Sequence, residues 1–263
     1  MAELLTLAGF GFLLGMRHAT DADHVIAVTT ILNRSRHFVD ATIIGAIWGL
    51  GHTVTVLIVG LLIIVFGVVI PPPVGLALEL AVAVMLILLG ILNLTGAMSR
   101  LTERFTPPAP MHGHDHEHLH AHEAGADQHG HEHAHLHGHG TDPGLVETFG
   151  WFQLGRPLVV GLVHGLAGSA AVALLVLTDL AINDRGQAMV YLVIFSAGVA
   201  AGMTILTTVI GLPFMVSRAR SDRINRYLTL GSGILSLAFG LFLAYQIGVV
   251  DGLFTGNFHW VPA

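Results

Sequence analysis

The sequence contains no cysteine and no lysine, and it has few charged residues of either sign. Without cysteine it has no disulfides, no thiolate metal ligands and no cysteine nucleophile. Without lysine it forms neither a P-loop with its phosphate-binding lysine nor a Schiff base, which argues against an ATP-driven pump within this chain. Charged residues make up 11% of the 263 residues, under half of the roughly 25% that is usual in soluble domains. Water is therefore not the main solvent of this protein.

Hydrophobic residues are abundant instead, at 53% of the chain, with a mean hydropathy of +0.74. They form runs long enough to cross a bilayer, which takes about 20 residues per helix. No positively charged stretch precedes the first run, so we interpret it as a span and not as a cleavable signal peptide. The predicted fold class is an all-α polytopic membrane protein with six transmembrane helices, at approximately 4–32, 41–70, 74–98, 157–180, 188–215 and 227–250.

The arginines predict the orientation of these spans. If the spans alternate in direction, only Arg185 lies on one side of the membrane, and Arg17 lies within the first span. Positive residues favour the cytoplasmic side. We therefore expect a multi-pass protein of the cytoplasmic membrane, with both termini outside and the large central loop in the cytoplasm. The arginines that then share the cytoplasmic side are Arg34, Arg36, Arg100, Arg104, Arg156, Arg218, Arg220, Arg223 and Arg226.

The two halves of the chain resemble each other at an offset of about 150 residues, as expected for an internal repeat. With three spans in each half, the second copy crosses the membrane in the opposite direction. Such inverted repeats recur in secondary transporters, whereas a six-helix bundle with chance glycine matches is the alternative. The matching segments are 15–19 with 161–165, 51–53 with 202–204, and 89–91 with 239–241.

The central segment differs in composition, because it is rich in proline and histidine and poor in large apolar residues. We predict a His-rich disordered cytoplasmic loop at 106–150, between a first three-helix repeat at 1–105 and a second, inverted one at 151–263. Alternating histidines in a flexible chain offer many weak sites for Ni²⁺, Co²⁺, Cu²⁺ or Zn²⁺. The loop either buffers metal or is a tolerated low-complexity insertion. Its auxiliary metal ligands would be His112, His114, His116, His118, His120, His122, His129, His131, His133, His135, His137 and His139.

Ionisable residues interrupt the first span. An ionised side chain at the bilayer centre costs about 2.5–3.5 kcal/mol, so the group needs partners or a water-filled cavity. On a regular helix His18 and His24 would lie about 9 Å apart along the axis, too far for two metal ligands with bonds near 2 Å. We therefore predict a break in the helix between them. A structural hydrogen-bond network is the alternative. The interrupting residues are Arg17, His18, Asp21, Asp23 and His24.

Imidazole and carboxylate ligands without thiolate suit Ni²⁺, Co²⁺ or Zn²⁺ better than Cu⁺. If the helix persists, Arg17 neutralises Asp21 four residues on, and the remaining carboxylate still favours a divalent cation. His52 lies in the middle of the second span between small residues, and His164 occupies the repeat position of His18. Each of these two histidines is either a further ligand or a buried packing residue.

The segment Arg17–Val25 closely resembles the signature helix of the nickel/cobalt transporter family, in which a His is followed by four residues and then Asp-His. The segment Gly51–Thr53 is similar to the second motif of that family, a Leu-Gly-His followed by a small hydroxyl residue. The resemblance implies membrane transport of Ni²⁺ and Co²⁺, with a metal site at the matched residues. We expect Arg17 and Thr53 to support that site and His164 to complete it from the second half. The matched residues are His18, Asp21, Asp23, His24 and His52.

The chain also departs from the family pattern. Its uptake permeases typically have eight spans with the signature on the second, whereas here the signature lies on the first of six. The segment Gly161–Ser169 looks more like the shorter urease-accessory-type relatives. The His-rich loop is similar to that of nickel/cobalt exporters of the same superfamily. These departures bear on the direction of transport.

The predicted function is that of a secondary transporter, not an enzyme, which uses no cofactor and moves Ni²⁺ or Co²⁺ as its cargo. Uptake is favoured because inward movement of a divalent ion gains about 4.6 kcal/mol per 100 mV. One alternative is an exporter that collects metal with the loop. Another is a membrane-tethered metal store or sensor, but such a protein needs no ionisable residues at bilayer depth, so the interrupted first span argues against it. Expected partners are a divalent transition-metal ion and the lipid bilayer, with a cytoplasmic nickel chaperone as a further candidate and no nucleic acid.

Overall fold

The computed structural model describes residues 2–32, 38–68, 70–97, 145–166, 184–220 and 222–260. These residues form seven α-helices and one π-helix, and no strand occurs among them. The prediction of an all-helical chain is confirmed for these ranges. The elements are α1 (Ala2–His18), α2 (Ala22–Leu32), α3 (Phe38–Phe66), α4 (Pro72–Leu94), α6 (Leu145–Leu166), α8 (Arg185–Arg220), α9 (Asp222–Tyr245) and the π-helix η2 (Gln246–Val250).

Within the described ranges, four helical stretches are long and apolar enough to cross a membrane, and two shorter apolar helices accompany them. Large apolar side chains also point away from the protein interior, as Leu50, Ile58 and Val193 do, each more than half exposed. Such side chains contact lipid favourably in a membrane protein, whereas water would penalise them. The protein is therefore a multi-pass membrane protein. The four long stretches are Val39–Phe66, Pro72–Leu94, Arg185–Phe214 and Arg223–Val250.

The boundaries of these helices lie within a few residues of the predicted spans, with one exception. Helix α6 begins at Leu145, twelve residues before the predicted start of the fourth span at Pro157. Residues 145–150, which the sequence placed in the loop, are therefore helical. Pro157 lies inside this helix, which extends upstream of it. The predicted span beyond residue 166 and the loop at 106–144 lie outside the described residues.

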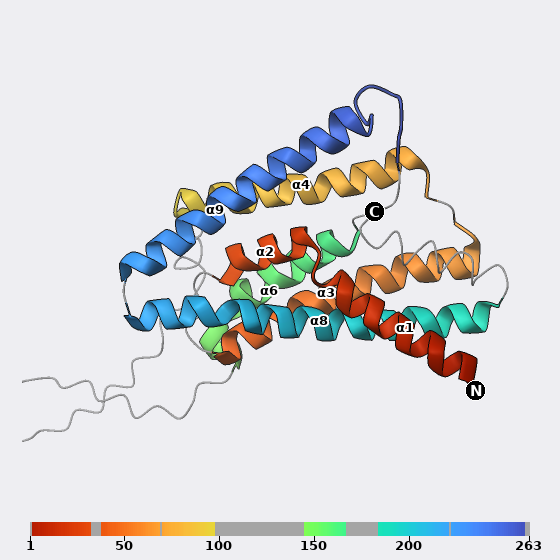
Figure 1. Ribbon diagram of the computed structural model, residues 1–263, viewed down its shortest axis with the longest axis horizontal. Helices are drawn as coiled ribbons and strands as arrows, with labels where there is room; N and C mark the ends of the chain where they lie inside the picture. Colours follow the sequence, from red (N-terminus) through yellow and green to blue (C-terminus); the bar gives the residue numbers. More distant parts are fainter. Residues whose placement is uncertain are drawn as a thin grey trace, which may run out of the picture.

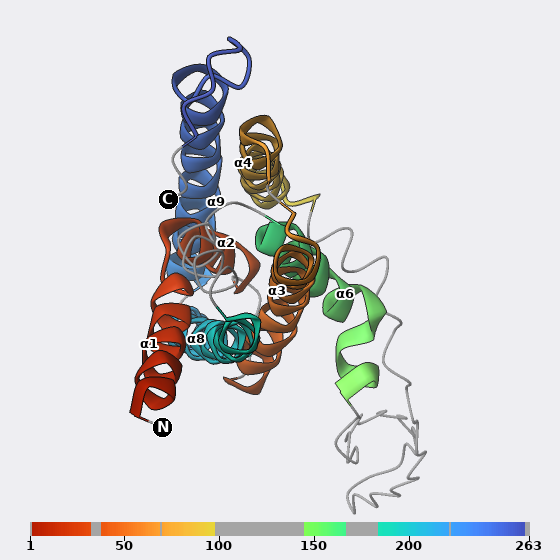
Figure 2. The same ribbon diagram turned by 90° about the vertical axis from the view of Figure 1, so that its right-hand side faces the viewer.

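The helices form two layers. Seen end-on, α1, α8, α3 and α6 stand in a row, and α9 and α4 form a second, paired layer above it (Figure 2). The short helix α2 lies between the layers and packs against α9, α8 and α4. This arrangement places the end of α1 and the start of α2 in the middle of the helix bundle.

Helix directions differ between the two halves of the chain. Along the long axis, α1 and α4 run one way and α3 runs the opposite way, whereas α6 and α9 run with α3 and α8 runs with α1 (Figure 1). Each helix of the second half thus runs opposite to the helix in the same order in the first half.

Close backbone contacts join neighbouring helices of the row. Gly15 in α1 lies so near the carbonyl oxygen of Phe195 in α8 that a Cβ atom would have no room. In the same way, Gly161 in α6 lies against the carbonyl oxygen of Trp48 in α3. Small residues let membrane helices approach closely and gain van der Waals contact. The glycines therefore determine how near these helices lie.

The paired layer shows the same feature. A Cβ atom on Gly90 in α4 would lie 2.7 Å from the backbone nitrogen of Leu237 in α9. A Cβ atom on Gly240 in α9 would lie 2.8 Å from the backbone nitrogen of Ile87 in α4. The contact between α4 and α9 is thus made twice, once from each helix.

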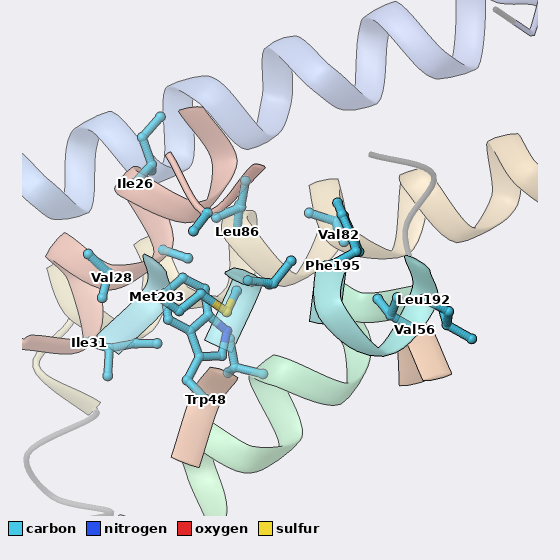
Figure 3. Packing of buried hydrophobic residues seen from close by; sticks show 14 of the residues in the cluster. Ile26, Val28, Ile31, Trp48, Val56, Val82, Leu86, Leu192, Phe195 and Met203 are labelled. Atoms are coloured by element: carbon cyan, nitrogen blue, oxygen red, sulfur yellow. The ribbon is translucent and has the colours of Figure 1, made fainter. Parts of the chain in front are cut away.

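Buried apolar side chains from α2, α3, α4 and α8 form one core at the centre of the bundle (Figure 3). The largest of them are fully enclosed, and they pack around the point where α1 gives way to α2. At the break itself His18, Ala19 and His24 are buried, whereas Arg17 and Thr20 are exposed. Members of the core include Ile31, Trp48, Leu86, Phe195 and Met203.

Candidate metal centre

The first predicted span is broken, as the sequence indicated. After α1 ends, the backbone N–H of Thr20 donates to the carbonyl oxygen of Arg17 at 2.9 Å, and that of Asp21 donates to His18 at 3.1 Å. These i→i+3 bonds form a tight turn. Helical bonding resumes when the N–H of Val25 donates to Asp21 at 3.1 Å. The turn separates α1 from α2 and redirects the chain.

The break brings three histidines together. The ring centroids of His18 and His24 lie 4.8 Å apart, and each lies 5.2 Å from that of His52 in α3. One ligand nitrogen from each ring lies within 4.8 Å of the other two. His24 and His52 are fully buried and His18 is 6% exposed. A regular helix would have kept the first two about 9 Å apart along its axis, so the turn is what allows the cluster to form.

Carboxylates orient two of these rings. Nδ1 of His18 lies 2.8 Å from Oδ2 of Asp21, and Nδ1 of His24 lies 3.0 Å from Oδ1 of Asp23. A carboxylate accepts, so each Nδ1 carries the hydrogen and each Nε2 keeps its lone pair. Nε2 of His18 lies 3.3 Å from Nε2 of His52, and Nε2 of His24 is buried without a hydrogen-bond partner among the described residues. The lone pair of His24 Nε2 thus has no proton donor among the described residues, and that of His18 Nε2 accepts from Nε2 of His52.

These distances are compatible with a single transition-metal ion. Metal–nitrogen bonds of about 2.0–2.1 Å place two ligand nitrogens roughly 3.0–3.4 Å apart, depending on octahedral or tetrahedral geometry. The two Nε2 atoms of His18 and His52, at 3.3 Å, are already in this range. The third nitrogen lies within 4.8 Å of both, so a small ring movement is enough to close the site.

Asp23 also links the cluster to the second half of the chain. Its Oδ2 atom lies 3.0 Å from Nε2 of His164 in α6, while its Oδ1 atom contacts His24. Ligand atoms of these three residues form a second group within 4.8 Å, and the ring centroids of His24 and His164 are 4.4 Å apart. Because the two groups share His24, they form one continuous centre.

The supporting roles predicted for Arg17 and Thr53 stay predictions. Arg17 is exposed and forms no ion pair with any described residue. Asp21 pairs with His18 instead, because α1 ends there and the i,i+4 relation to Arg17 is lost. The hydroxyl of Thr53 donates to the carbonyl oxygen of Ser196 in α8 at 3.3 Å. Thr53 therefore connects α3 to α8. The twelve loop histidines lie outside the described residues.

Two aromatic residues at the cluster were not predicted from the sequence. The Trp48 ring lies 5.5 Å from the ring of His24 and 5.8 Å from that of His164. The Phe195 ring lies 6.0 Å from that of His18. Trp48 precedes His52 by four residues, so helical periodicity places both on one face of α3, and this signal was available. Phe195 had no comparable local signal.

Fold and site together define a helical, multi-pass membrane protein with a buried histidine–aspartate cluster on a broken helix. Residues 4–221 match the family NicO, described as high-affinity nickel-transport protein. The chain is 34% identical over 252 residues to the urease accessory protein UreH of Bacillus sp. (strain TB-90), and the alignment covers 96% of each chain. No solved structure matches it significantly.

The chain therefore belongs to the NicO family of nickel transporters, which are transport proteins and not enzymes. The resemblance carried by segment Arg17–Val25 is confirmed.

Proposed function

We propose that this protein is a secondary transporter that carries Ni²⁺ or Co²⁺ into the cell through a site formed by His18, His24 and His52. The observation that carries the proposal is the meeting of three buried imidazoles at the break between α1 and α2. Two of them are held by carboxylates so that Nε2 is available to an ion. Imidazole nitrogens suit Ni²⁺ and Co²⁺, and membership of the NicO family supports this class of cargo.

In this proposal Asp21 and Asp23 act through the histidines and do not bind the ion themselves. A carboxylate behind a ligating histidine fixes its tautomer and raises its basicity. Their two negative charges also offset the two positive charges of the ion, which matters most at Asp23, whose side chain is only 14% exposed. His164 holds the second oxygen of Asp23 and so connects the site to α6. The pair of carboxylates favours a divalent over a monovalent cation.

Uptake follows from the energetics of the membrane. A divalent ion entering the cell gains about 4.6 kcal/mol per 100 mV of membrane potential, so no ATP is needed. We propose that the protein lies in the cytoplasmic membrane with its arginine-rich helix ends and the His-rich segment in the cytoplasm. That segment, or a cytoplasmic nickel chaperone, would receive the ion. The likeness to a urease accessory protein makes nickel the first ion to test.

We further propose six spans arranged as two inverted repeats. The opposite directions of corresponding helices support this arrangement. The glycine contacts support it as well. Gly15 contacts Phe195, and Gly161 contacts Trp48. Gly161 lies 146 residues after Gly15, and Trp48 lies 147 residues before Phe195, so the second contact repeats the first with the two halves exchanged. The contacts of Gly90 with Leu237 and of Gly240 with Ile87 are related in the same way, at an offset of 150 residues. Random packing would not produce matched contacts in both layers.

The contacts imply a register that differs from the sequence alignment by one helical turn in α3 and α8. The offset of 147 matches His52 with Val199, whereas the sequence comparison aligned it with Met203. Under this arrangement α1 and α2 form one interrupted span, and α6 begins the fourth. Residues 167–183, which would correspond to α2, lie outside the described residues. Rocking of one repeat against the other would expose the central site to each side in turn.

The nickel content of cells at submicromolar external nickel tests the direction and the site together. Cells with the parent protein should accumulate nickel faster than cells without it, and His18→Ala should return the rate to that of empty cells. His259→Ala is the matched control, because His259 is exposed and outside the cluster. Accumulation below that of empty cells would establish export instead. An unaltered rate in membrane-inserted His18→Ala protein would contradict the proposed site.

A further inference from the structure

The histidine cluster is bounded by one aromatic ring from each half of the chain. Trp48 in α3 contacts the rings of His24 and His164, and Phe195 in α8 lies against the ring of His18. Both aromatic side chains are at most 1% exposed. The indole nitrogen of Trp48 has no hydrogen-bond partner among the described residues, and phenylalanine has no polar atom. Either ring can therefore turn without breaking a hydrogen bond.

The two rings occupy corresponding places in the two halves. Trp48 and Phe195 are separated by the offset of 147 that relates α3 to α8, and the carbonyl oxygen of each receives a close-packed glycine, Gly161 and Gly15 respectively. Because the halves run in opposite directions, corresponding residues face opposite sides of the membrane. The symmetry of the contacts thus assigns one ring to each side.

The register between α3 and α8 supports this placement. A Cβ atom on Gly49 would lie 3.2 Å from Cα of Ala200, and Thr53 donates to the carbonyl of Ser196. Phe195 is therefore level with a point about two residues, or roughly 3 Å, beyond His52, whereas Trp48 lies four residues, or roughly 6 Å, before it. Side chains lean toward the N-terminus of their own helix, which separates the two rings further. They lie well apart in the core (Figure 3).

We propose that Trp48 and Phe195 are the two gates of the transport cycle. Phe195 closes the path from the side on which α8 begins, and Trp48 closes the path from the side on which α3 begins. The inference rests on the proposed function, since gates need a transported ion. With both rings buried against the histidines, the structure corresponds to an occluded state. Turning one ring away opens the site to one side while the other ring keeps it closed.

The absence of cysteine makes the proposal directly testable. His52→Cys places a single thiol between the rings, and a charged, membrane-impermeant thiol reagent is applied to intact cells and to inverted membrane vesicles. With the proposed orientation α8 begins outside and α3 begins in the cytoplasm. Phe195→Ala should therefore speed labelling in intact cells about tenfold, and Trp48→Ala should do so in inverted vesicles, as expected when opening becomes easier by about 1.4 kcal/mol. Leu86→Ala, which empties a fully buried site in α4, is the control for a non-specific cavity.

Trp48→Phe and Phe195→Tyr keep an aromatic ring and should label as slowly as the His52→Cys parent, which separates gating from misfolding. Labelling that increases from both sides, from the same side for both variants, or no more than in Leu86→Ala would overturn the proposal. Faster labelling of Phe195→Ala in inverted vesicles and of Trp48→Ala in intact cells would support the gates and overturn the proposed orientation in the membrane. Nickel binding by the chain with His52 intact tests the proposed function separately, because its failure leaves the sidedness of labelling readable.

Discussion

In the first half of the molecule α3 presents His52 and Trp48 to the centre, whereas under the proposed repeat the corresponding positions of α8 in the second half are Val199 and Phe195. The helix crossings are nevertheless made alike in both halves, with glycine against a backbone carbonyl. Of the histidines at the break, only His18 has a counterpart in the second half, His164. The halves thus share their packing and differ in their chemistry.

This difference follows from what each requirement demands. Close approach of two helices is a steric condition at every crossing, so both halves need small residues there. A metal site needs three or four ligands at one place, and α1, α2 and α3 supply enough of them. In the proposals above, the second half contributes the gate Phe195 and a link through His164, whose Nε2 lies 3.0 Å from Oδ2 of Asp23.

The largest effect on nickel affinity should distinguish His52 from Val199, its counterpart in the proposed repeat. His52→Ala removes a proposed ligand, so we expect nickel affinity to fall more than about 100-fold, beyond what outer residues of metal sites contribute. Val199→Ala should change the affinity by no more than a few-fold. Quenching of Trp48 fluorescence by Ni²⁺, in a Trp151→Phe, Trp260→Phe background, reports on this site and not on the loop. Equal losses in the two variants would show that the halves contribute equally to binding.

The shared packing should break equally in either half. Gly15→Ala and Gly161→Ala force a Cβ atom into backbone, so each should lower the free energy of unfolding by about 1–3 kcal/mol. Gly9→Ala and Gly155→Ala are the matched controls in the same two helices, because no atom of the described residues lies within 4 Å of a Cβ atom at either position. Thermal unfolding in detergent measures all four. A loss confined to one half would count against the repeat.

A smaller effect should separate the two aspartates. Asp23 is 14% exposed and holds His24 and His164, whereas Asp21 is 42% exposed and holds only His18. We expect Asp23→Asn to weaken nickel binding about 10–100-fold, as for an outer carboxylate, and Asp21→Asn to weaken it less. The same quenching titration measures both. If Asp23→Asn abolished binding as completely as His52→Ala, Asp23 would have to be a direct ligand.

Much of the fold could be predicted because a membrane helix is recognised from a local run of apolar residues. The spans and the break between His18 and His24 follow from hydropathy and from the cost of charge in lipid. The start of α6 was misplaced because its first turns are less apolar than a span and follow a proline-rich segment. The pairing of Asp21 with His18 depends on α1 ending at His18, whereas the sequence predicted only that a break lies between His18 and His24.

The sequence by itself determined the environment, the chemical class of the ligands and the family, because each depends on residue types and short spacings. Only the tertiary structure decided which nitrogens meet, that Asp23 connects His24 to His164 from 141 residues away, and that Trp48 and Phe195 bound the cluster. Those outcomes depend on the direction and register of helices distant in sequence. Backbone contacts at glycines set that register, and no local pattern specifies which carbonyl a glycine will meet.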